Sequence, residues 1–76
     1  MSAGDATPHR VTCHLGRLLD ERSMTLVQLA AMTGITVVNL SVLKNDRAKA
    51  IRFSTLTAIA DALECQPGDL LSITPA

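Results

Sequence analysis

The sequence feature that most constrains the fold is a turn, T-G-I-T at residues 33–36, between two segments with helical periodicity. Gly34 can adopt the left-handed backbone conformation that ends a helix, because it has no Cβ atom. Ile35 supplies an apolar side chain for the corner between two helices. The pattern predicts two short helices that meet at a sharp angle. Their expected inward faces are Leu26, Leu29, Ala30 and Met32 before the turn, and Leu40 and Leu43 after it.

Capping residues predict where the helices begin. Thr25 followed three residues later by Gln28 is a capping-box pattern, and Thr36 is an N-cap candidate for the next helix. Ser54 is the expected N-cap of a later helix, and Pro67 is expected to start a last short helical turn. An earlier helix is expected at residues 15–22. The inward positions expected for the helix after Ser54 are Leu56, Ile59, Ala60 and Leu63.

Both ends of the domain carry strand-like patterns. Val11, Cys13 and Leu15 alternate with polar residues, which predicts a short strand. The apolar tail at residues 70–73 suggests a second strand that pairs with the first near Val11 and Cys13. Because edge strands pair readily, these segments are also the candidates for a contact between two copies of the chain.

The composition favours an all-α domain with an aliphatic core. The chain has 76 residues, of which 47% are hydrophobic, and its one aromatic residue is Phe53. A chain of this length forms one domain, and a β-sandwich core would usually draw on Tyr, Phe and Trp. We therefore expect four or five helices with short terminal β-strands over residues 10–76, after a disordered N-terminal lead-in at residues 1–9.

The remaining composition points to a cytoplasmic protein. Cys13 and Cys65 form no CxxC pair, which favours two reduced and mostly buried thiols. The polar N-terminus lacks the order of a signal peptide, and no apolar run approaches the ~20 residues of a membrane span. We expect no metal, no cofactor and no enzymatic activity. His9 and His14 with the two cysteines lack a recognised spacing for metal ligands. Asp61, Glu64 and Asp69 lack the paired arrangement that acid–base catalysis needs.

Charge is balanced overall but unevenly distributed. The formal net charge is zero, which argues against DNA binding. The stretch from Asp61 to the end carries acids and no Lys or Arg, however, whereas residues 44–52 carry one acid, Asp46, and several cations. Such a basic run is usually a solvated loop, but directly after a helix that enters a groove it is suited to neutralising phosphates. The cations concerned are Lys44, Arg47, Lys49 and Arg52.

Residues 25–45, T-L-V-Q-L-A-A-M-T-G-I-T-V-V-N-L-S-V-L-K-N, resemble the helix-turn-helix of the Cro and phage-repressor-like (XRE) family. Residues 53–71, F-S-T-L-T-A-I-A-D-A-L-E-C-Q-P-G-D-L-L, are similar to the last two helices of that family's compact form. The resemblance runs from about Val11 to Ile73. It implies a four- to five-helix repressor-like domain that regulates transcription by binding operator DNA, usually as a dimer.

The resemblance also implies roles by position. The helix beginning at Thr36 would enter the major groove as the recognition helix. The residues implied to lie nearest the base edges are Thr36, Val37, Val38, Asn39 and Ser41. The residues implied to contact phosphates are Gln28, Lys44, Arg47, Lys49 and Arg52, with Arg17 and Arg22 as further candidates from the first helix.

Two departures from the family pattern keep a second function open. Val37 and Val42 stand where many members carry arginine, so bidentate recognition of guanine is lost there. Val37 and Val38 could instead contact thymine methyl groups, which predicts A·T-leaning recognition with most affinity from phosphates. The first hypothesis is a sequence-specific regulator of double-stranded DNA, a repressor. The alternative keeps the fold as a protein-interaction module, an adaptor or antitoxin-like partner, which the neutral charge and the valines favour.

Overall fold

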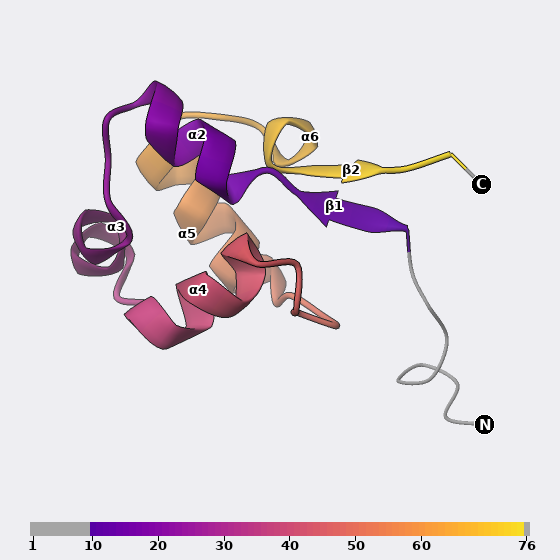
Figure 1. Cartoon of the computed structure of the whole chain (residues 1–76). Coiled ribbons are helices and arrows are strands. Elements are labelled where there is room, and N and C mark those ends of the chain that lie inside the picture. Colours follow the sequence, from indigo (N-terminus) through magenta and orange to yellow (C-terminus); the bar gives the residue numbers. More distant parts are fainter. Residues whose placement is uncertain (1–9, 76) are drawn as a thin grey trace.

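The computed structural model describes residues 10–75, which form a small helical domain closed by a two-stranded ribbon (Figure 1). This confirms the predicted fold class; the predicted lead-in at residues 1–9 lies outside the described residues. In chain order the described elements are β1 (Val11–Cys13), α2 (Leu15–Glu21), α3 (Leu26–Thr33), α4 (Val37–Lys44), α5 (Phe53–Leu63), α6 (Pro67–Leu70) and β2 (Leu71–Ile73).

The core is aliphatic, as predicted. Each of the described helices contributes at least one side chain with less than 2% exposure, and burial of each such side chain stabilises the fold by about 1.5–3 kcal/mol. Phe53 stays outside this core with 85% of its surface exposed. The most deeply buried side chains are Leu15, Leu29, Leu40, Ile59, Leu63 and Leu70.

The structure corrects two predictions: Met32 does not face the core, and Ser54 is not an N-cap. Met32 is 57% exposed, because the inward face of α3 is centred on Leu29 and the half-buried Thr33 and leaves Met32 at its edge. Helix α5 begins at Phe53 rather than after Ser54. Its N-cap is Arg52, whose carbonyl oxygen already accepts the first helical hydrogen bond from the Leu56 N–H at 2.9 Å.

The predicted caps around the turn are confirmed. The Gln28 Oε1 atom accepts the Thr25 N–H at 2.8 Å, while the Thr25 hydroxyl accepts the Gln28 N–H at 3.1 Å. Gly34 ends α3 in the left-handed region with φ 76°, and the Thr36 hydroxyl accepts the Asn39 N–H at the start of α4. Local chemistry therefore fixes where both helices begin and where the turn between them lies.

The predicted strand pairing is also confirmed. β1 and β2 are antiparallel, with Val11 opposite Ile73 and Cys13 opposite Leu71. The inner pair, Cys13 and Leu71, is half-buried against the core, whereas the outer pair is exposed. The ribbon extends from the helical body at the end of the molecule opposite α3 (Figure 1).

Asp46 joins the loop after α4 to this ribbon. Its backbone is left-handed, with φ 58°, and its Oδ1 atom accepts the Cys13 N–H at 2.8 Å. The loop at residues 45–52 is thereby attached to β1.

Within residues 10–75, no helix is both long and apolar enough to cross a membrane.

Candidate nucleic-acid interface

The corner between α3 and α4 is held by side-chain contacts. The Thr33 hydroxyl donates to the Leu29 carbonyl oxygen at 2.8 Å and accepts the Ile35 N–H at 3.2 Å. Ile35 is half-buried and packs against the core. Because the corner is fixed and Leu40 and Leu43 point inward, the opposite face of α4 is held toward solvent.

The outward face of α4 is apolar and exposed at its N-terminal end. Val38 is 72% exposed and Val37 is 40% exposed, and Thr36 lies beside them at the helix start. Ser41 is half-buried, and its hydroxyl accepts a hydrogen bond from the Asn45 side-chain amide at 3.2 Å. The structure thus gathers Thr36, Val37, Val38 and Ser41 on the accessible part of one helix.

Asn39 lies on a different side of α4, beside the basic loop. It lines an open hollow of about 590 Å³ together with Val42 of α4 and Thr55 of α5. The opposite wall of the hollow is the loop, which contributes the cations Arg47, Lys49 and Arg52. The three predicted phosphate contacts of the loop therefore share one concave surface next to the predicted recognition helix.

The loop cations are not neutralised by the fold. Within residues 10–75, the side chains of Arg47, Lys49 and Arg52 form no ion pair and donate no hydrogen bond. The one acid of this stretch, Asp46, is engaged at Oδ1 by the Cys13 backbone. A concave cluster of uncompensated positive charge is suited to binding a polyanion.

Lys44 differs from the loop cations, because its aliphatic stem lies against α2. A Cβ atom built on Gly16 would come 3.4 Å from the Lys44 Cε atom, so the glycine gives room for this stem. Gly16 is not among the residues predicted to matter from the sequence. Its signal would have been a glycine inside a helix, which often marks a close approach.

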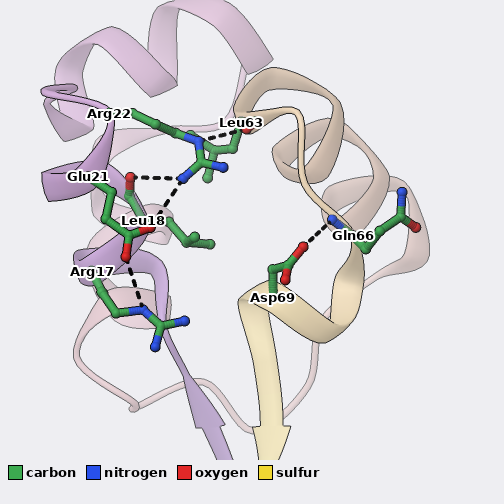
Figure 2. A network of polar contacts seen from close by, with 7 residues as sticks. All are labelled: Arg17, Leu18, Glu21, Arg22, Leu63, Gln66 and Asp69. Atoms are coloured by element: carbon green, nitrogen blue, oxygen red, sulfur yellow. Dashed lines mark hydrogen bonds and ion pairs between the residues drawn. The ribbon is translucent and has the colours of Figure 1, made fainter.

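Arg17 of α2 and Arg22, the C-cap residue of α2, have partners within the domain (Figure 2). Arg22 is half-buried and donates from Nε to the Leu63 carbonyl oxygen at 2.7 Å, and its guanidinium lies 3.6 Å from the Glu21 carboxylate. Arg17 is an exposed ion-pair partner of the same carboxylate at 3.8 Å. The C-terminal end of α2, where Arg22 lies, is on the far side of the domain from the basic loop (Figure 1).

Gln28 keeps a donor available at the start of α3. Its Oε1 atom is used in the capping box, and within residues 10–75 its side-chain NH₂ group donates no hydrogen bond. An exposed amide donor at this place suits a phosphate oxygen.

The His14 side chain and the two cysteine side chains are held within the fold. His14 Nε2 is hydrogen-bonded to the Ser72 hydroxyl at 2.6 Å, across the base of the ribbon, and His9 lies outside the described residues. Both cysteines are free and half-buried. Burial raises the pKa of the Cys13 thiol, and the nearby Asp46 carboxylate raises it further. Burial also raises the pKa of the Cys65 thiol.

Comparison with known proteins decides the family. The model of the Cro/C1-type helix-turn-helix DNA-binding domain matches residues 14–76, which is most of the chain. This protein belongs to that family. The chain is also 59% identical, over 54 residues, to a protein of Bacillus subtilis (strain 168) named as an uncharacterized HTH-type transcriptional regulator, YozG.

The match to the Bacillus protein covers 71% of this chain and 64% of the relative's own length. No solved structure matches the chain significantly. The chain is therefore a Cro/C1-type DNA-binding domain, in which α3 and α4 are the two helices of the helix-turn-helix.

Proposed function

We propose that this protein is a sequence-specific regulator of transcription that binds double-stranded DNA with α4 in the major groove, as a homodimer, and acts as a repressor. The observation that carries the proposal is the cluster of uncompensated cations directly after the exposed face of α4 in a chain of this family. The protein acts in the cytoplasm, where both free thiols stay reduced.

Phosphate contacts supply most of the affinity in this proposal. Arg47, Lys49 and Arg52 hold one DNA strand through the loop, with support from Lys44 and from the Gln28 amide at the start of α3. Arg17 and Arg22 were also predicted as phosphate contacts, but their contacts with Glu21 give that role less support.

Base recognition depends on the start of α4. Val37 and Val38 present methyl groups that suit the thymine methyl in the major groove, while Thr36, Asn39 and Ser41 offer hydrogen-bonding groups. Because none of these residues is an arginine, we expect an A·T-leaning site and a modest preference for sequence over random DNA.

A second candidate function rests on exposed apolar side chains of α3 and α4. Val27 is 67% exposed and Met32 is 57% exposed on α3, and Val38 adds 72% exposure on α4. Apolar side chains of this kind also suit the helix of a protein partner. In this alternative the domain is an adaptor or an antitoxin-like module.

Salt dependence separates the two candidates. The purified protein is titrated against a pool of random duplexes at low and moderate salt. Contact with about five phosphates gives a log–log slope of affinity against salt near −4 to −5, whereas an apolar protein interface responds little. Enrichment of a palindromic motif with a steep slope supports the dimeric regulator, and no binding at low salt overturns it.

Variants of α4 test base recognition separately from phosphate contact. Val38→Ala and Ser41→Ala are expected to change which sequences are enriched, while the salt slope stays the same. Unchanged enrichment in both variants would contradict the placement of this face against the bases.

A further inference from the structure

The ribbon, α4 and the loop at residues 45–52 line a second, mostly apolar hollow. Its volume is about 220 Å³. Most of its lining is apolar: Val11, Cys13 and Leu71 come from the ribbon, Leu43 comes from α4, and Ala48, Ala50 and Ile51 come from the loop. Open apolar hollows of this kind stabilise a complex when an apolar side chain fills them and excludes water.

An apolar side chain lies on the same surface, next to the hollow. Ile73 of β2 is 67% exposed, and it is paired across the ribbon with Val11, which is 39% exposed. Side chains of one strand alternate between faces, so the Val11–Ile73 pair shares its face with Cys13 and Leu71, which line the hollow. The surface therefore carries both an exposed side chain and an opening of matching chemistry.

We propose that this face, the ribbon with the hollow beneath it, is the contact surface between two copies of the chain. A two-fold contact requires a surface complementary to itself, in which residue i meets j and j meets i. Ile73 of each copy fills the hollow of the other, so that both apolar features are buried together.

Charges at the rim of the hollow fit the same arrangement. Asp46 and Lys49 both line it and carry opposite charges. A two-fold axis beside the hollow brings the carboxylate of one copy toward the ammonium group of the other, and it does so twice. The ammonium group has three donors, so it can contact this carboxylate and a DNA phosphate together. A partner that carries charge of only one sign could pair with Asp46 or with Lys49, but not with both.

The contact is continuous with the proposed DNA-binding surface. Ala48, Lys49 and Ile51 line both hollows, whereas Arg47 and Arg52 line only the hollow next to α4, so the loop separates the contact with the second copy from most of the cations. Dimer formation packs the second copy against the loop that holds the phosphates, and it sets the spacing of the two α4 helices on DNA. This inference rests on the homodimer in the proposed function and assigns its surface.

Measurement of mass without DNA tests the contact. Analytical ultracentrifugation of the full chain is run from about 1 µM to about 1 mM, the range in which small contacts dissociate. The variant is Ile73→Asp, which places a carboxylate in the apolar contact and is expected to raise the dimer dissociation constant at least about tenfold. The matched control is Val27→Asp, since Val27 is also 67% exposed but lies on α3.

A second variant protects the test against a folding defect in the ribbon. Ala50 is exposed and lines the hollow from the loop, so Ala50→Arg obstructs the opening without a change in either strand. Circular dichroism checks that each variant keeps its helices. If Ile73→Asp does not fold, Ala50→Arg decides the outcome.

The proposal is supported if the wild-type chain and Val27→Asp dimerise while the two ribbon-face variants are monomers. It is overturned if the wild-type chain is a monomer throughout, if both ribbon-face variants dimerise normally, or if Val27→Asp disrupts the dimer equally. The DNA titration is separate, so a dimer that binds no DNA overturns the proposed function and leaves this contact standing.

Discussion

The arginines of α2 and its C-cap carry the same charge as the cations of the loop at residues 45–52, but in very different surroundings. Arg17 and Arg22 share the Glu21 carboxylate, and Arg22 also donates to a backbone carbonyl at the end of α5. Arg47 and Lys49, in contrast, have no such partner within residues 10–75. A cation already paired in the fold must give up its partner to bind a phosphate, whereas an unpaired one gives up only water.

This difference explains how a chain with zero net charge can belong to a DNA-binding family. Glu21 pairs with both Arg17 and Arg22, and the acid inside the loop, Asp46, accepts the Cys13 N–H of the ribbon. Positive charge therefore remains concentrated beside α4, where its field is strongest.

The largest expected effect comes from removal of the unpaired loop cations. In Arg47→Ala/Arg52→Ala, DNA affinity is expected to fall about 10- to 100-fold and the salt slope to flatten by about 2, because two phosphate contacts are lost while the proposed contact between copies, which neither residue lines, is kept. The melting temperature should stay unchanged, since neither side chain forms a hydrogen bond or an ion pair within residues 10–75. Titrations at several salt concentrations measure this, with Arg17→Ala as the matched loss of one α2 cation. Equal slopes in the wild-type and double variant would remove the distinction between the two regions.

Arg22→Ala should show the opposite behaviour. The change removes the hydrogen bonds to the Leu63 and Leu18 carbonyl oxygens, so the free energy of unfolding is expected to fall by about 1–2 kcal/mol. Urea unfolding measures the loss, and a DNA titration of the folded variant should match the wild-type chain. If stability were kept and affinity fell instead, Arg22 would belong with the loop cations.

Gly16→Ala tests whether Lys44 is a phosphate contact, like the loop cations, or a residue held by the fold, like Arg22. Alanine is the better helix former, and its Cβ atom meets only the movable end of the Lys44 side chain at 3.4 Å. We expect stability to rise by about 0.5–1 kcal/mol and DNA affinity to stay unchanged. A fall in affinity without a loss of helix content would show that displacement of Lys44 matters, and would place it with the loop cations.

The smallest effect is expected for Arg17→Ala. Its ion pair with Glu21 is exposed and one helical turn apart, so its loss should cost about 0.3–0.5 kcal/mol of stability. The salt slope of DNA binding should hardly change. Thermal unfolding and titration together check this, and a slope flatter by about 1 would restore Arg17 as a phosphate contact.

Features decided by a few neighbouring residues were predictable from the sequence. The Thr25–Gln28 capping box, the left-handed Gly34 and the start of α6 at Pro67 each depend on contacts within one turn of backbone. The ribbon was predictable because its alternation and the apolar tail are both visible in the sequence. The predicted contacts with DNA bases and phosphates stay predictions.

Contacts between distant residues were not predictable. Arg22 and Leu63 are 41 positions apart, and Cys13 and Asp46 are 33 positions apart. No local sequence pattern therefore predicts either hydrogen bond. Their consequences are large, because the first removes an arginine from the expected phosphate contacts and the second ties up the loop's acid. The exposure of Met32 was missed for a related reason, since the packing of α3 against its neighbours decides which edge of the stripe is covered.

The ribbon has a consequence for the order in which this domain assembles. It pairs the first and last described segments, and contacts such as that between the Thr12 and Thr74 hydroxyls span 62 positions. Closing so long a loop costs entropy that three-residue strands cannot offset alone. The ribbon therefore forms after the helices pack and opens before they separate. The amides of His14 and Thr74, which donate across it, should exchange with deuterium sooner than those of α3 and α4.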